Sequence, residues 1–113
     1  MTIADIHTAD LDGEYPLFFP IDSFPVDLFD QVKELGYSLN GYFFEGFSDF
    51  LAEDKGIDTE DIDYDPEAEL FQAVGPEDGI GKLKQAYVEA FADADRFLDT
   101  VRRAIGAGYE LED

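Results

Sequence analysis

The sequence predicts an α+β fold, in which an antiparallel sheet made from two hairpins packs against about four helices. Two observations predict it. Short stretches with alternating apolar residues occur in pairs, each joined by a turn signal. The remaining stretches repeat apolar residues every three or four positions, as amphipathic helices do. With 113 residues and 45% hydrophobic content, the chain can bury one core, so we expect residues 1–113 to form a single domain.

The first hairpin is predicted near the N-terminus. Residues 3–8 (IADIHT) alternate apolar and polar positions, and Asp12-Gly13 is a turn signal. The second apolar run, residues 15–21 (YPLFFPI), contains two prolines. Because proline donates no backbone hydrogen bond, we expect this second strand to be short or to lie at a sheet edge.

Two helices are predicted next. In the first, residues 25–35, Ser23 and Pro25 stand at the start, and Gly36 stands past the end. Its apolar residues recur at helical spacing: Leu28, Phe29, Val32 and Leu35.

The second predicted helix spans residues 42–54. One face carries Phe43, Phe47, Phe50 and Leu51, with Phe44 at its margin, and the other carries Glu45, Ser48, Asp49 and Glu53. We expect the first face to be core and the second to be solvated. Gly46 lowers helix propensity, which indicates a place where another segment packs closely.

The second hairpin joins residues 61–65 (DIDYD) to residues 69–74 (ELFQAV) through a turn at 65–68. Strict alternation in DIDYD puts Ile62 and Tyr64 on one face and three aspartates on the other. Two helical stripes follow, with a bend predicted at 93–95. We expect the last residues, 109–113, to form a loose acidic tail.

Charge is the most informative bulk property of the chain. Seven Lys and Arg residues against 28 Asp and Glu residues give a net charge of -21. Such a field repels nucleic acid and anionic membranes, and it accelerates encounter with a basic partner. We therefore expect no nucleic-acid or membrane partner. A need for solubility or a saline habitat would each produce the same charge without any partner.

Cysteine is absent, and the sequence starts without a basic segment followed by an apolar run. The longest apolar runs extend over a few residues, which is too short to cross a bilayer. Together these features favour a reducing cytoplasm as the location, without a signal peptide or membrane span.

The residues offer little for catalysis. A nucleophile–base pair would need His7, the only histidine, which we interpret as an ordinary surface or edge residue. No nucleotide-binding, metalloprotease or hydrolase motif occurs. We expect no enzymatic activity and no cofactor.

A calcium site is the one metal hypothesis that the sequence invites. In an EF-hand loop that started at Asp61, the turn glycine would be Pro66 and the bidentate glutamate would be Gln72. Strand alternation explains the spacing of the acids better than metal binding does. We therefore predict no metal ligands.

Protein binding is the remaining class of function. Exposed aromatic residues ringed by carboxylates suit a partner that offers Lys and Arg around an apolar pocket. In the aromatic stretch NGYFFEGFSDF (40–50), two rings lie off the core stripe and are candidate anchors. The predicted partner-binding residues are Tyr42, Phe44, Glu45, Asp58, Glu60, Asp61, Asp63 and Asp65.

Two separated motifs also resemble a known family. The stretch FDQVKELGYSLNGYFFEGFSDFLAE (29–53), followed by IDYDPEAELFQAVG (62–75) and two helical stretches, is similar to the Immunity protein 51 family. The residues that carry the resemblance are Leu35, Gly36, Asn40, Gly41, Tyr42, Glu45 and Gly46, and then Asp65, Pro66, Glu67, Ala68 and Phe71. The resemblance covers about residues 26–105.

Members of that family are small bacterial proteins encoded beside polymorphic toxins, and they are thought to bind and neutralise the toxin. The resemblance therefore implies an immunity protein with a cognate toxin as its partner. The negative charge favours a basic toxin, such as a nuclease. The alternative is an acidic structural or adaptor domain from a salt-adapted organism, with no toxin partner.

Overall fold

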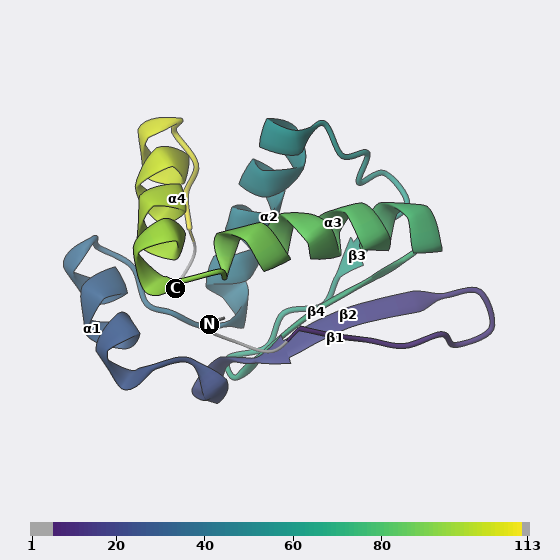
Figure 1. Ribbon diagram of the computed structural model, residues 1–113, viewed down its shortest axis with the longest axis horizontal. Helices are drawn as coiled ribbons and strands as arrows, with labels where there is room; N and C mark the ends of the chain where they lie inside the picture. The colour runs from purple at the N-terminus through teal and green to yellow at the C-terminus, as the bar shows by residue number, and fades with distance from the viewer. Residues whose placement is uncertain (1–5, 112–113) are drawn as a thin grey trace.

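The computed structural model describes residues 6–111, which form a four-stranded antiparallel sheet and four α-helices (Figure 1). This architecture confirms the predicted α+β fold. Helices α2 and α3 cover one face of the sheet, and α1 and α4 lie together at one end of the molecule. The elements are β1 (His7–Thr8), β2 (Tyr15–Pro20), the 3-10 turn η1 (Ile21–Ser23), α1 (Val26–Glu34), α2 (Gly41–Lys55), β3 (Asp63–Tyr64), β4 (Leu70–Gly75), α3 (Glu77–Ala90) and α4 (Ala94–Gly106).

The strand order is β1-β2-β4-β3, so β2 is an interior strand of six residues. The prediction of a short or edge strand is wrong, and backbone direction explains why. Ile21 donates its N–H to Glu69 on the β4 side, whereas Ala9 donates to the Pro16 carbonyl on the β1 side. Pro16 and Pro20 therefore both face β1, which is only two residues long. Neither proline removes a hydrogen bond between β2 and β4.

The first predicted strand, residues 3–8, is represented by β1 alone among the described residues. Residues 3–5 of that prediction lie outside them. The other boundaries differ from the predictions by small amounts. Helix α2 begins at Gly41 because the Asn40 side chain accepts the N–H of Phe43 at 2.9 Å, and it ends at Lys55 because Gly56, with a φ of 68°, caps it.

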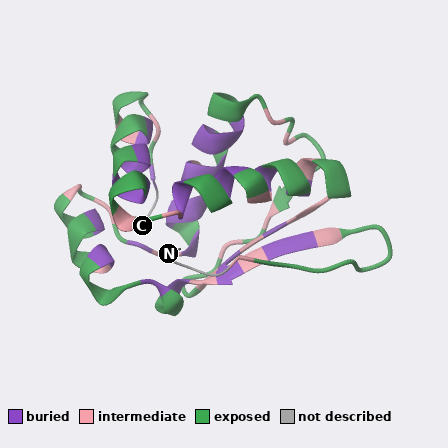
Figure 2. Ribbon diagram, viewed as in Figure 1, coloured by how far each residue is buried: buried purple, intermediate pink, exposed green. Residues whose placement is uncertain are grey.

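The core is built around α2, which the sheet, α3 and α4 contact (Figure 2). Phe43, Phe47, Phe50 and Leu51 are buried as predicted. Ser48 and Phe44 are also buried, each with 0% exposure, so the prediction of a single buried face is too narrow. A helix with neighbours on several sides buries more than the one stripe that a surface helix presents.

The C-terminal segment is the second departure from the sequence-based picture. Leu111 is fully buried, and the ring of Tyr109 lies 5.5 Å from that of Phe50, so residues 109–111 are packed rather than loose. Residues 112–113 of the predicted tail lie outside the described residues. A Cβ at Gly46 would lie 2.6 Å from the carbonyl oxygen of Glu110. The close packing predicted at Gly46 is confirmed, and the segment that packs there is the C-terminal one.

Gly41 holds the start of α2 against the turn between β3 and β4. Its N–H donates to the Ala68 carbonyl at 3.4 Å. A Cβ at this position would lie 1.8 Å from the Glu67 oxygen and 2.4 Å from the Leu70 oxygen. Because both neighbours are backbone atoms, no side-chain rotation can make room.

We expect Gly41→Ala to destabilise the fold by about 2 kcal/mol, because the helix must move away from the turn. Gly81→Ala is the matched control, since Gly81 lies inside α3 with nothing within 4 Å of its added Cβ. The control should raise stability by up to about 1 kcal/mol through helix propensity. Urea denaturation of both variants measures the difference, and equal stabilities would show that Gly41 is not a close-packing position.

Candidate functional site

The candidate site is a surface rather than a cavity, and it begins at the first turn of α2. Tyr42 is 42% exposed there, next to the β3–β4 turn that Gly41 contacts. Glu45 is exposed one turn further along the same helix. These two predicted binding residues are therefore accessible, and the start of their helix is tied to the β3–β4 turn by the bond from Gly41 to Ala68.

The predicted acidic segment follows α2 and continues into β3, an edge strand. Asp58, Glu60, Asp61, Asp63 and Asp65 are all exposed. Ile62 is buried and Tyr64 is half-buried, so the alternation predicted for DIDYD is confirmed, although β3 itself contains only Asp63 and Tyr64. The aspartates lie on the solvated side of the strand.

The structure arranges these acids in two groups joined by β3. At one end, Asp58 and Asp61 line a cavity of about 160 Å³ together with Asp78 and Lys82 at the start of α3. At the other end, Asp65 precedes the β3–β4 turn, whose Ala68 carbonyl accepts the N–H of Gly41, the residue before Tyr42. We name the whole set the acidic strip; it consists of Tyr42, Glu45, Asp58, Glu60, Asp61, Asp63 and Asp65.

Asp49 on α2 also belongs to the candidate site, because it acts on Tyr64 from the helix side of β3. The spacing of the sequence does not single this residue out. The hydroxyl of Tyr64 is buried, and no described residue forms a hydrogen bond with it. Burial raises the pKa of Tyr64, and the charges of Asp49 and Glu45 raise it further. Partial burial also raises the pKa of Asp49, while the Tyr64 hydroxyl opposes that shift. Tyr64 and Asp49 therefore shift each other's pKa, which indicates that the Tyr64 hydroxyl lies close to the Asp49 carboxylate.

Phe44 does not belong to this surface. Its side chain has 0% exposure, and its ring lies 4.9 Å from that of Phe19 on β2. The prediction of Phe44 as a partner anchor is corrected, since a ring inside the core cannot contact a partner. Position 44 lies off the narrow stripe that helical spacing selects, but α2 also buries this side beneath the sheet.

A buried polar pair joins α2 to α3. Ser48 and Tyr87 are hydrogen-bonded through their hydroxyls, and Tyr87 donates to the Phe44 carbonyl at 3.4 Å. Burial raises the pKa of Tyr87, so its hydroxyl remains protonated and serves α2–α3 packing. Helical spacing placed Ser48 on the solvated side, and no signal in the local sequence indicates its partner 39 residues away.

His7 is an exposed residue of the edge strand β1, as predicted, and its ring stacks on Phe18 at 5.3 Å. Within residues 6–111, no three His, Cys, Asp or Glu side chains are arranged to hold a metal ion. The site as built offers carboxylates and one aromatic ring for contact with another molecule.

Comparisons with known proteins found no matching family model, curated protein or solved structure. None of the helices in the described part of the chain is long and apolar enough to cross a bilayer.

Truncation of Phe44 and of Tyr42 distinguishes a core residue from a surface residue. We expect Phe44→Ala to destabilise the domain by about 4 kcal/mol, because it opens a cavity in the core. Tyr42→Ala should change stability by less than about 1 kcal/mol, since its ring is partly in solvent. Thermal and urea unfolding measure both, and a stable, folded Phe44→Ala protein would contradict the assignment of Phe44 to the core.

The raised pKa of Asp49 predicts that the stability of the domain depends on pH. Its folded-state pKa is raised by partial burial, so protonation favours the folded state, and this contribution is lost as pH rises through the folded-state pKa. Asp49→Asn should therefore raise the Tm at pH 7, and the gain should vanish below the unfolded-state pKa, at about pH 3.

Asp30→Asn is the control for Asp49→Asn, because it removes the same charge from an exposed position on α1. Calorimetry at both pH values measures the Tm of each variant. A gain at pH 7 that is equal in the two variants would assign the effect to net charge rather than to the environment of Asp49.

Proposed function

We propose that this protein is an immunity protein that binds a cognate bacterial toxin domain and neutralises it by charge-steered occlusion. The observation that carries the proposal is the acidic strip, which combines exposed carboxylates on and beside an edge strand with an exposed tyrosine at the start of α2. The resemblance of residues 26–105 to the Immunity protein 51 family supports the same role. The proposal places the protein in the cytoplasm of the producing cell.

Electrostatics supports a basic partner. At physiological ionic strength the screening length is about 8 Å, so the charges nearest a docking partner decide its orientation. A surface of one sign can raise association rates by about 10 to 1000-fold. The chain has 28 acidic residues, and every carboxylate of the acidic strip is exposed and available for pairing.

Tyr42 would supply the apolar part of the contact. Tyrosine is enriched among the residues that dominate binding energy, because its ring buries a large area with few rotatable bonds. The other members of the acidic strip are carboxylates, so a matching pocket on the toxin would combine an apolar floor with Lys or Arg at its rim. Toxins that attack nucleic acid commonly present such basic surfaces, and occlusion of that surface would stop substrate binding.

The distribution of the remaining acids favours a second candidate, an acidic structural or adaptor domain from a salt-adapted organism. Exposed acids that do not belong to the acidic strip also cover η1 and α1, at Asp22, Asp27, Asp30 and Glu34. Charge that is spread in this way suits solubility at high salt. A proteome in which unrelated proteins carry comparable negative charge would favour this candidate.

Co-expression with the toxin encoded beside the gene tests the proposal. The immunity protein should rescue growth of cells that express the toxin, and the two proteins should co-purify. The absence of a toxin gene from the neighbourhood, together with failure to rescue any host, would contradict the proposal.

The acidic strip itself is tested by Asp58→Asn, Asp61→Asn, Asp63→Asn and Asp65→Asn in one variant. We expect the association rate with the toxin to fall at least about tenfold and its salt dependence to flatten, because steering comes from these charges. Stopped-flow or surface-plasmon measurements at several salt concentrations report both quantities.

The matched control changes the same number of acids elsewhere, through Asp22→Asn, Asp27→Asn, Asp30→Asn and Glu34→Gln. Its net charge is identical, so a rate close to the original assigns steering to the acidic strip. Equal losses in the two variants would mean that total charge, and not the acidic strip, attracts the toxin.

A further inference from the structure

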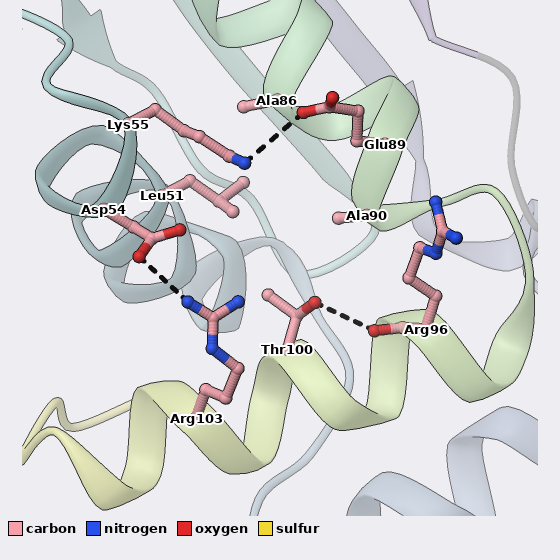
Figure 3. Close-up of a pocket in the computed structure, with 9 residues that line it drawn as sticks. All are labelled: Leu51, Asp54, Lys55, Ala86, Glu89, Ala90, Arg96, Thr100 and Arg103. Atoms are coloured by element: carbon pink, nitrogen blue, oxygen red, sulfur yellow. Dashed lines mark hydrogen bonds and ion pairs between the residues drawn. The ribbon is translucent and has the colours of Figure 1, made fainter.

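A second charged surface of opposite sign lies between three helices. A cavity of about 200 Å³ is formed where α2, α3 and α4 meet (Figure 3). We name it the basic cleft; its lining residues are Leu51, Asp54, Lys55, Ala86, Glu89, Ala90, Arg96, Thr100 and Arg103. Three of the seven basic residues of the chain line this one cavity, whereas only two of its 28 acids do.

Each helix contributes a regular stripe to the basic cleft. Helix α4 supplies Arg96, Thr100 and Arg103, spaced by four and three residues, which lie on one helical face. Short side chains on α3, at Ala86 and Ala90, leave the space open. The floor residues are buried, whereas the charged residues at the rim are exposed.

The cations of the basic cleft differ in how they are held. Arg103 donates to Asp54 at 2.9 Å, and its guanidinium lies 5.5 Å from the centre of the Phe50 ring. The Lys55 ammonium is 3.5 Å from Glu89. Within residues 6–111, Arg96 has no salt bridge. Figure 3 shows Lys55 and Arg103 on one side of the cavity and Arg96 on the other, with Thr100 between the two arginines.

We propose that the basic cleft is an anion-binding site that takes one oxyanion group, a carboxylate or a phosphate, between Arg96 and Arg103. A guanidinium presents several N–H donors in one plane and matches the paired oxygens of either group. Arg96 supplies unpaired donors. Arg103 keeps its place through Asp54 and Phe50 and directs its remaining donors to the ligand. Lys55 adds a third positive charge, because its exposed pair with Glu89 contributes little and can open.

The overall negative charge of the protein does not prevent this binding. Exposed charges further away than a Debye length, about 8 Å at physiological ionic strength, are largely screened. An anion in the basic cleft therefore interacts mainly with the three cations, with Asp54 and Glu89, and with Asp93, whose carboxylate accepts the backbone N–H of Arg96 at 2.7 Å. This site does not depend on the proposed toxin partner, because its cations lie outside the acidic strip.

The test uses the three arginines of the chain as probes. The side-chain Nε–Hε signals of Arg96, Arg102 and Arg103 are followed by ¹⁵N NMR during titration with inorganic phosphate or with succinate. Sodium chloride at the same ionic strength is the reference. We expect saturable shifts at Arg96 and Arg103 and none at Arg102, which is exposed on the same helix and does not line the cavity.

Two matched variants complete the test. Arg96→Gln should weaken binding about tenfold, the equivalent of one lost charge-assisted contact, whereas Arg102→Gln should change it less than about twofold. Saturation by phosphate alone identifies a phosphate group as the ligand, and saturation by succinate identifies a carboxylate. Shifts that sodium chloride reproduces, or equal weakening in the two variants, would overturn the proposal.

Discussion

The packing of the Phe44 ring against other aromatic rings is the interaction on which the rest of the structure depends. It lies within 6.3 Å, between ring centres, of aromatic rings from β2, the segment before α1, α2 itself, β4, α3 and the start of α4. Aromatic pairs at such distances add to the stabilisation that burial of apolar area provides. One residue therefore links the sheet, α3, the start of α4 and the segment before α1 within a single core.

A core of this kind leaves the surface free to carry charge. The elements that surround α2 bury its apolar side chains. The domain therefore does not need apolar residues on its surface to remain folded. Its surface can hold a net charge of -21, although self-repulsion then opposes the compact state. The two ends of α2 belong to surfaces of opposite charge. Its first turn belongs to the acidic strip, and its last turn, with Asp54 and Lys55, belongs to the basic cleft.

Local sequence patterns predicted the parts of the fold that depend on neighbouring residues. The two hairpins, the helix stripes, the alternation around β3 and the close packing at Gly46 follow from spacing and from glycine chemistry. What the patterns could not predict depends on direction or on distant partners. The interior position of β2 requires knowledge of which side each proline faces. The burial of Phe44 and Ser48 requires knowledge that α2 has neighbours on several sides.

The candidate surfaces also include features that local patterns predict and features that depend on distant partners. Exposure of the aspartates around β3 follows from alternation, but Asp49 enters the site only because β3 returns to place Tyr64 beside it. The basic cleft combines residues from 51 to 103, and no pattern within any one helix indicates it.

The acidic strip and the basic cleft also adjoin each other. Lys82 lines the small cavity at the Asp58 end of the acidic strip, and it lines a further hollow of about 310 Å³ that shares Lys55, Ala86 and Glu89 with the basic cleft. A surface of one sign attracts any partner of opposite charge but does not fix its orientation. Two adjoining regions of opposite sign distinguish one docking direction from its reverse, because a reversed partner would bring like charges together. A partner that used both regions would therefore need a basic surface with one acidic group beside it.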